Sequence, residues 1–294
     1  MVVDAAYAVC QRLASRHYEN FPVASRLVPR SMRPHIAAIY AFARVADDFA
    51  DEGSRSDSAR LALLDDWRHR LYRAAAGETP DEGSDATAIF TALGATMRRC
   101  GLEVQLFDDL LGAFRQDVLV KRYETWEDLL DYCRRSANPV GRLVLSVAGH
   151  REPGLDERSD AVCTALQLTN FWQDLERDWQ KGRLYVPQIF VRSSGADEID
   201  LDRRRMTPAW RDALGIAATR TRALFQAGRP IADAVTGRFR WELRLTWLGG
   251  VRLLDRLEAS GFDVFGRRPT LGWRDAPALV GRLLSWSRGG RPFG

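Results

Sequence analysis

Apolar residues recur every three to four positions along most of the chain, which is the period of an α-helix with one buried face. Residues 57–76 show the pattern clearly, because four large apolar side chains fall on a common face: Leu61, Leu64, Trp67 and Leu71. Almost no segment alternates with the two-residue period of a β-strand. The pattern therefore predicts a mostly α-helical protein.

Proline and glycine residues divide the chain into successive helices. Pro34 begins a helix over residues 35–50, and Gly53 ends it. Two longer interruptions are a polar loop at 77–85 and an extended connection marked by Gly182, Pro187 and Gly195. The remaining predicted helices cover residues 57–76, 86–99, 103–120, 125–135, 140–150, 160–180, 208–227, 230–237 and 240–260, with a short helix in the tail after Gly261.

The chain contains no linker long enough to divide it into domains and no tandem repeat. Residues 1–294 are therefore predicted to form a single all-α domain, in which the helices pack as a bundle. With 46% hydrophobic and 28% charged residues, the chain can bury a full-sized core and is neither fibrous nor disordered.

The sequence offers no candidate for a membrane span or a secretory signal. The longest uncharged apolar run, Ala161–Gln173, has 13 residues, fewer than the roughly 18 that a membrane span needs. No basic segment followed by an apolar core stands at the beginning. We therefore expect a cytoplasmic protein.

Charge is unevenly distributed, because residues 1–200 contain 25 Lys and Arg against 31 Asp and Glu, whereas residues 201–294 contain 18 against 8. A basic surface attracts nucleic acid, anionic lipid or phosphorylated ligands. No zinc-finger, RNP or K-homology pattern accompanies the charge, so we predict no nucleic-acid partner. Peripheral contact with a membrane remains open through the basic and aromatic residues of the tail: Arg267, Arg268, Trp273, Arg282, Trp286, Arg288, Arg291 and Phe293.

The four cysteines lie far apart in the sequence, at Cys10, Cys100, Cys133 and Cys163, and none belongs to a C-x-x-C pair. This spacing favours free, partly buried thiols over a zinc site or a disulfide framework.

A cluster of three carboxylates ends the helix predicted at 35–50. Asp47 and Asp51 lie one helical turn apart, with Asp48 between them, so the first two face the same way. Two stacked carboxylates repel each other unless a cation joins them. Considered alone, the cluster could also be a solvated acidic helix end.

A second polar cluster, 127 residues further along, changes that interpretation. Asn170, Asp174 and Asp178 follow an i, i+4, i+8 spacing, and Gln167 extends the row. Their neighbours are large and apolar, and buried carboxylates without partners are costly. Hard oxygen ligands point to Mg²⁺ rather than zinc or copper, and the four histidines are too few for a di-iron bundle.

Two acidic clusters on different helices are suited to clamp a diphosphate. Metal ions neutralise the negative charge that develops on a departing diphosphate, and its departure leaves a carbocation. Aromatic faces stabilise such a cation by roughly 0.5 to 2 kcal/mol each. Candidates for an aromatic wall, each of which could equally be ordinary core, are Phe21, Tyr40, Phe49, Tyr132, Phe171 and Trp172.

Four segments resemble the squalene/phytoene synthase family over nearly the whole chain: HYENFPVAS at 17–25, AIYAFARVADDFADE at 38–52, YCRRSANPVGRL at 132–143 and LTNFWQDLERDWQKGRLYVP at 168–187. HYENFPVAS, SANPVG and NFWQD are most similar to its hydroxysqualene synthase branch in bacterial hopanoid biosynthesis. The resemblance implies an isoprenoid-synthase helical bundle with a central cavity, Mg²⁺ as cofactor and presqualene diphosphate, or farnesyl diphosphate, as substrate. It also implies other enzymes of hopanoid biosynthesis as partners.

The resemblance assigns roles to individual positions. Asp47, Asp48 and Asp51 match the first aspartate motif, and Asn170, Asp174 and Asp178 match the second, which together would bind Mg²⁺ and diphosphate. Tyr40 would lie near the leaving group and Tyr132 near the cation. Further substrate contacts are implied for His17, Asn20, Phe21, Arg44, Ala137, Val140, Gly141, Gln167, Phe171, Gln173, Lys181, Arg183 and Tyr185.

Three positions depart from the family pattern. Gln173 stands where an arginine is usual, Asn138 follows Ala137 where a glycine is frequent, and Gly250 aligns near a tyrosine of many members. Fewer cations and more amides suggest fewer contacts to a second diphosphate and more capacity to hold water. We therefore expect hydrolytic capture of the cation, which gives hydroxysqualene.

Two alternatives stay open beside this expectation. The first is condensation of two prenyl diphosphates, by a presqualene diphosphate synthase or a phytoene synthase. The second is a non-catalytic prenyl-lipid-binding or assembly protein. The sequence contains no G-x-G-x-x-G segment in a βαβ context, so it gives no sign of reduction by a nicotinamide cofactor.

Overall fold

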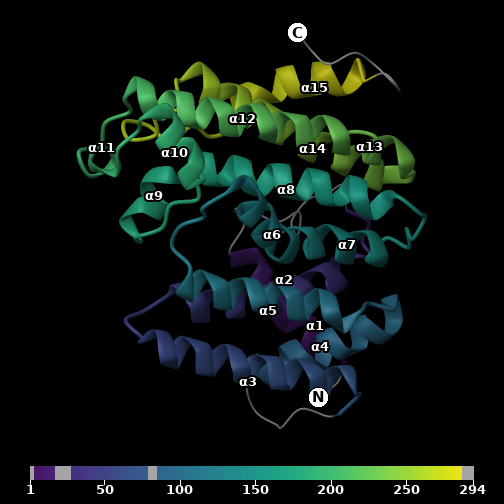
Figure 1. The fold of residues 1–294 in the computed structure, drawn as a ribbon. Helices are drawn as coiled ribbons and strands as arrows, with labels where there is room; N and C mark the ends of the chain where they lie inside the picture. Colours follow the sequence, from purple (N-terminus) through teal and green to yellow (C-terminus); the bar gives the residue numbers. More distant parts are fainter. Residues whose placement is uncertain (1–2, 17–27, 79–84, 287–294) are drawn as a thin grey trace. The chain divides into compact units, whose positions relative to one another are not determined.

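The computed structural model describes residues 3–16, 28–78 and 85–286, and this part of the chain is all-α (Figure 1). Within it, extended pairing is limited to an isolated parallel bridge between Arg122 and Leu184. The helical period of the apolar residues therefore predicted the fold class correctly. No helix among the described residues has the length and apolar character that crossing a membrane requires.

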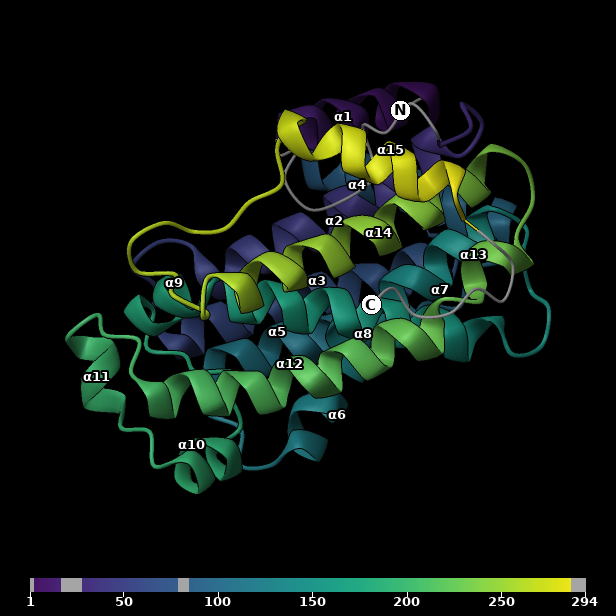
Figure 2. The same ribbon diagram turned by 90° about the horizontal axis from the view of Figure 1, so that it is seen from above.

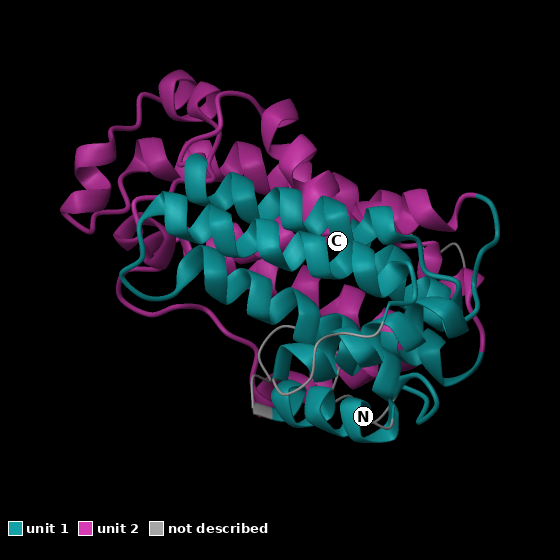
Figure 3. Ribbon diagram, turned by 90° about the horizontal axis from the view of Figure 1, so that it is seen from below, with its two compact units in different colours: residues 1–119, 139–153, 237–242 teal, residues 120–138, 154–236, 243–294 magenta. Residues whose placement is uncertain are grey.

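The chain folds into two compact units, each assembled from three stretches of sequence (Figure 3). Unit 1 comprises residues 1–119, 139–153 and 237–242, and unit 2 comprises residues 120–138, 154–236 and 243–294. The single domain expected from the sequence stays a prediction.

Unit 1 is built around one alanine-rich helix. Its helices are α1 (Val3–Arg16), α2 (Arg33–Asp51), α3 (Asp57–Ala75), α4 (Asp85–Cys100), α5 (Val104–Leu119) and nearly all of α7 (Asn138–Val147). Helix α2 contacts α1, α3, α4 and α5. Its many alanines let four neighbours approach closely, and its buried residues lie on several sides of the helix.

An aromatic cluster fixes the packing of unit 1. The Trp67 ring lies 4.5 Å from that of Phe90 and 6.0 Å from that of Phe42, and its indole N–H donates to the Phe42 carbonyl at 3.3 Å. The predicted inward face of residues 57–76 is confirmed at Leu64, Trp67 and Leu71, which are all buried.

Unit 2 is built around α8 (Leu155–Gln173). Its other helices are α6 (Trp126–Ser136), α9 (Leu175–Gln180), α10 (Gln188–Ser194), α11 (Glu198–Asp202), α12 (Pro208–Gly228), α13 (Ile231–Ala234), most of α14 (Gly237–Ala259), the 3-10 turn Trp273–Asp275 and α15 (Ala276–Leu284). Helices α8 and α12 lie side by side (Figure 2). A Cβ atom on Gly228 would lie 2.5 Å from Val162 Cγ2, so only glycine permits this close approach.

Two sequence predictions in unit 2 need correction. The helix predicted at 160–180 begins earlier, at Leu155, and is interrupted at Asp174. The connection predicted to be extended around Gly182–Gly195 contains the short helix α10, and α11 follows it. Both added helices are shorter than the windows in which apolar periodicity is recognisable.

Candidate functional site

One face of α2 carries the first acidic cluster. Arg44 forms ion pairs with Asp47 and Asp48, with Nη1–Oδ2 and Nη2–Oδ1 distances of 3.4 and 2.5 Å. These side chains and Asp51 are partly buried, and they lie on the side of the last turns of α2 that does not face the core. The sequence predicted that Asp47 and Asp51 face the same way, and the structure adds Arg44, whose positive charge reduces the repulsion within the cluster.

Tyr40 lies one turn before Arg44, next to this cluster. Burial is the main cause that raises the pKa of its hydroxyl group, and the charges of Asp47 and Asp48 raise it further, whereas Arg44 lowers it. The hydroxyl therefore stays protonated at neutral pH and can donate a hydrogen bond.

The second polar cluster forms a half-buried stripe on α8 and α9. Gln167, Asn170, Asp174 and Asp178 are all partly exposed, whereas Leu168, Thr169 and the residues from 171 to 173 are buried. The break at Asp174 preserves the stripe, because the Asp174 N–H donates to the Asn170 carbonyl at 2.8 Å and the Asp178 N–H donates to the Asp174 carbonyl at 2.9 Å. The predicted one-turn spacing therefore persists.

Arg268 is a residue of this cluster that the sequence did not reveal. Its Nε and Nη2 atoms donate to the two Asp174 carboxylate oxygens at 2.6 and 2.9 Å, and Nη2 also donates to Gln173 Oε1 at 2.9 Å. The Gln173 Nε2 atom in turn donates to the Pro269 carbonyl at 2.5 Å. The cluster that lacks an arginine at position 173 thus receives one from the C-terminal segment.

The amides that depart from the family pattern are engaged within the protein. Both polar ends of Gln173 have protein partners, and Asn138 Oδ1 accepts a hydrogen bond from Thr164 Oγ1 at 2.9 Å, with both residues buried. Hydrogen bonds within the protein therefore use part of the polar capacity that was expected to hold water, and that expectation stays a prediction. The third departure, Gly250, has a steric cause, because a Cβ atom there would lie 2.6 Å from Leu166 Cδ2 and 2.7 Å from Phe225 Cζ.

Four rings of unit 2 form an aromatic cluster. Phe171 and Tyr185 stack at 3.7 Å with an interplanar angle of 3°, and Tyr132 lies 6.1 and 5.9 Å from them. Tyr123, which the sequence analysis did not select, lies 5.5 Å from Tyr132 and 5.8 Å from Tyr185. Of the predicted aromatic wall, Tyr132 and Phe171 are therefore neighbours.

The other candidates for the aromatic wall have different surroundings. Trp172 is fully buried, and its indole N–H donates to Thr221 Oγ1 at 3.0 Å, so it belongs to the core between α8 and α12. Phe49 packs edge to face on Trp67 in unit 1, at 5.4 Å. Phe21, with His17 and Asn20, lies outside the described residues.

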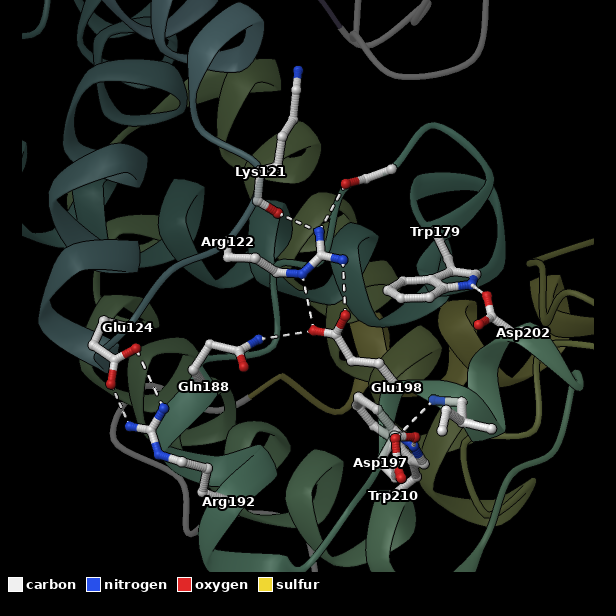
Figure 4. Close-up of polar contacts among 12 residues, drawn as sticks. Lys121, Arg122, Glu124, Trp179, Gln188, Arg192, Asp197, Glu198, Asp202 and Trp210 are labelled. Carbon is white, nitrogen blue, oxygen red and sulfur yellow. Dashed lines mark hydrogen bonds and ion pairs between the residues drawn. The ribbon is translucent and has the colours of Figure 1, made fainter.

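The loop after α9 carries three predicted contacts in different environments. Lys181 is exposed, whereas Arg183 and Tyr185 are 9% and 7% exposed. The loop is tied to Arg122, whose Nη1 donates to the Gly182 carbonyl at 2.7 Å (Figure 4). Burial of Arg183 argues against a freely solvated arginine at that position.

The remaining predicted contacts are divided between the units. Ala137 is buried at the C-terminal end of α6 in unit 2, whereas Val140 and Gly141 lie on α7 within unit 1. Within the described residues, no three His, Cys, Asp or Glu side chains gather into a ready-made metal site. Paired carboxylates and an amide oxygen nevertheless fit Mg²⁺, which usually binds one or two protein carboxylates together with water and substrate phosphates.

The basic surface predicted for the tail is only partly formed. Arg268 pairs with Asp174 and Arg282 with Asp255, whereas Trp286 is buried beneath Arg229, whose Cζ atom lies 4.4 Å from its ring centroid. Trp273 is 81% exposed, and Arg267 is exposed. Arg288, Arg291 and Phe293 lie outside the described residues.

Unit 2 also contains a cavity of about 330 Å³. It is lined by Arg222, Gln226, Trp247, Val251, Asp255, Glu258 and Arg282. Arg222 pairs with Asp255 at 2.9 Å and with Glu258 at 2.6 Å, so its charges are balanced within the cavity. None of the predicted site residues lines it.

Comparisons with known proteins agree on the family. The family model described as squalene/phytoene synthase matches residues 14–275. A hydroxysqualene synthase of Zymomonas mobilis is 42% identical over 74% of this chain and 71% of its own length, and a 15-cis-phytoene synthase of Synechococcus elongatus is 31% identical over 96% and 94%. The crystal structure of squalene synthase HpnC from Alicyclobacillus acidocaldarius superposes with a TM-score of 0.81, at 41% identity over 89% of this chain and 96% of that one.

Proposed function

Since the chain belongs to the squalene/phytoene synthase family, we propose that it converts presqualene diphosphate into hydroxysqualene and diphosphate. The carbon–oxygen bond to the diphosphate breaks, and its electron pair leaves with the diphosphate. The cyclopropylcarbinyl cation rearranges, water attacks it, and the attacking water loses a proton. The sum consumes one water, releases diphosphate and a proton to solvent, and requires no reductant. Because the reaction begins with cleavage of the carbon–oxygen bond to diphosphate, we class the proposed activity as that of a carbon–oxygen lyase.

The observation that carries this proposal is that both acidic clusters are intact on partly exposed helix faces. Asp47 and Asp51 on α2, with Asn170, Asp174 and Asp178 at α8 and α9, would hold Mg²⁺. The bound metal would neutralise charge on the departing diphosphate. These carboxylates are partly exposed, and metal ligands need this partial exposure if a charged substrate is to reach them.

Other residues of the chain would bind and orient the substrate. Arg44 pairs with Asp47 and Asp48 in the first cluster. In the second, Arg268 pairs with Asp174, and the backbone N–H groups of Lys181 and Arg183 donate to the Asp178 carbonyl. The stacked pair Phe171 and Tyr185, with Tyr132, would present aromatic faces to the cation, each worth roughly 0.5 to 2 kcal/mol. Tyr40 would donate its proton in a hydrogen bond to the leaving group. The contacts assigned to His17, Asn20, Phe21, Ala137, Val140, Gly141, Gln167 and Gln173 remain part of the proposal.

The decisive experiment identifies the product. Purified protein with Mg²⁺ and presqualene diphosphate should release diphosphate and form hydroxysqualene, detected by mass spectrometry. Product from farnesyl or geranylgeranyl diphosphate alone would instead indicate the condensing activity, which the 31% identity to a phytoene synthase keeps as the second candidate. Binding of these prenyl diphosphates without turnover of any of them would indicate a non-catalytic member of the family.

Variants of the acidic clusters test the metal assignment. Asp51→Asn and Asp174→Asn should each lower turnover by about 100-fold or more, because each removes a charged ligand. Asp66→Asn on α3 is the matched control, since Asp66 is exposed and pairs with Arg70 one turn away at 2.7 Å. Unchanged kinetics in both cluster variants would refute the proposed metal clamp.

We also propose that α15 makes peripheral contact with an anionic membrane. The membrane would supply the apolar substrate to this enzyme and would carry its product to other enzymes of hopanoid biosynthesis. No residue of α15 is buried, and Val280 and Leu284 are 49% and 79% exposed beside the exposed Trp273. Arg274 lies against the Trp273 ring, with its Cζ atom 5.4 Å from the centroid. Apolar and aromatic side chains beside arginines are typical of interfacial helices.

Co-sedimentation with vesicles tests this contact. The wild-type protein should bind vesicles that contain phosphatidylglycerol more strongly than neutral vesicles, and the double variant Trp273→Ser/Leu284→Ser should lose most of that binding. Ile199→Ser, a change at a 51% exposed residue of α11, is the control. Equal binding by both variants would refute contact through α15.

A further inference from the structure

Arg122 occupies an unusual position outside the predicted motifs, because its guanidinium donates to two distant segments as well as to the preceding residue (Figure 4). Its Nε and Nη2 atoms donate to the two Glu198 carboxylate oxygens at 2.9 and 3.0 Å. Its Nη1 atom donates to the Lys121 carbonyl at 2.8 Å and to the Gly182 carbonyl at 2.7 Å. The Cζ atom lies 5.0 Å from the ring centroid of Trp179. One side chain thus joins α9, the loop after it and α11.

The backbone around Arg122 follows the same loop. The Leu184 N–H donates to the Lys121 carbonyl at 3.0 Å, and the Gln188 N–H donates to the Tyr123 carbonyl at 2.9 Å. Successive side chains of an extended segment point to opposite sides. Arg122 accordingly contacts Glu198, whereas Tyr123 joins the aromatic cluster beside Tyr185. The guanidinium and the aromatic cluster therefore hold the loop from two sides.

We infer that Arg122, fixed by Glu198, is a positioning residue that sets the conformation of the loop 181–187 and thereby places Lys181, Arg183 and Tyr185. This inference rests on the proposed function, in which those three residues face the prenyl diphosphate. Arg122 acts through the loop and is not itself a catalytic residue. An arginine suits this role because its rigid fork binds a carboxylate through two atoms while its plane lies against an aromatic ring.

A neighbouring ion pair provides a matched control. Arg192 also pairs with a glutamate, Glu124, which follows Arg122 by two residues in the sequence (Figure 4). The side chains of this pair are 58% and 61% exposed, against 31% and 36% for Arg122 and Glu198. Exposed ion pairs contribute little to stability. Arg192→Gln should therefore leave the loop and the activity nearly unchanged.

The experiment compares Arg122→Gln, Arg122→Lys and Glu198→Gln with Arg192→Gln. Hydrogen exchange, measured by mass spectrometry on peptides covering residues 181–190, should become at least about tenfold faster in Arg122→Gln. The dissociation constant for inorganic diphosphate with Mg²⁺, measured by calorimetry, should rise about tenfold. In turnover of presqualene diphosphate, KM should rise more than kcat falls, and Arg122→Lys should restore part of both losses.

Glu198→Gln keeps the inference testable if Arg122→Gln folds poorly, since it preserves the shape of the partner and removes only its charge. Its effects should resemble those of Arg122→Gln and should not add to them in the double variant. Unchanged hydrogen exchange and diphosphate affinity in both single variants would overturn the inference, as would equal effects in Arg192→Gln. Faster exchange in the loop with weaker diphosphate binding, in a protein that does not consume presqualene diphosphate, would support the positioning role and refute the proposed reaction.

Discussion

Two adjacent glycines of α14, Gly249 and Gly250, should respond to the same substitution with opposite signs. Neither has a positive φ, so alanine fits the backbone of both. Alanine is favoured over glycine in the interior of a helix by about 1 kcal/mol. The difference must therefore come from the space around each added methyl group.

The surroundings of the two positions differ sharply. A Cβ atom on Gly249 would meet only Leu271 Cδ1, at an ordinary 3.4 Å, whereas one on Gly250 would lie 2.6 Å from Leu166 Cδ2 and 2.7 and 2.8 Å from two atoms of Phe225. Forcing an extra methyl group into such a packed interior costs typically 1–3 kcal/mol. Gly249→Ala should therefore stabilise the protein by up to about 1 kcal/mol, and Gly250→Ala should destabilise it by up to about 2 kcal/mol.

The measurement is urea unfolding followed by circular dichroism, with wild-type protein under the same conditions. A change in midpoint without a change in slope reports stability rather than an altered unfolded state. Stabilisation of similar size in both variants would refute the reasoning, because it would mean that α14 does not approach Leu166 and Phe225 as closely as described. The larger tyrosine that many family members carry near Gly250 should destabilise this protein more than alanine does.

Other predictions concern charge and burial. Arg268→Gln should raise KM for the prenyl diphosphate about tenfold, and an unchanged KM in steady-state assays would exclude Arg268 from binding it. The hydrogen bond from the Gly272 N–H is the main cause that lowers the pKa of Asp275, and Arg256 and Arg252 lower it further. The ionised Asp275 carboxylate therefore stabilises the fold fully above about pH 4, and this stabilisation is lost at lower pH. Asp275→Asn should thus destabilise at pH 7, with a difference in unfolding midpoint that shrinks below pH 4. Burial raises the pKa of Cys10 to about 12 and that of Cys133 as well, so neither should react with iodoacetamide in native protein at pH 8, and rapid labelling would contradict this.

Local sequence patterns predicted the main helices and the polar faces of two of them. The apolar period identified the inward face of α3, and four-residue spacing placed Asp47 with Asp51 and Asp174 with Asp178. These features depend only on residues that are close together in the sequence. The break at Asp174 was missed because neither proline nor glycine marks it.

Long-range partners could not be predicted in the same way. Arg268 reaches Asp174 across 94 positions, and a single sequence contains no signal for that pairing. The amides at Gln173 and Asn138 were interpreted as groups able to hold water, because the sequence does not show that Pro269 and Thr164 are their hydrogen-bond partners. The thiols were predicted correctly, since all four cysteines are free and Cys10 and Cys133 are buried.

The composition of the two units has a consequence for synthesis on the ribosome. Unit 1 includes residues 237–242, so its first 119 residues emerge long before its last segment is made. At roughly 5–20 residues per second, the intervening residues take on the order of ten seconds to translate. During that interval the nascent chain lacks Phe239, whose ring stacks on that of His150 at 6.3 Å. A truncation before residue 237 would remove segments of both units, so we expect neither unit to be completed until α14 has been made.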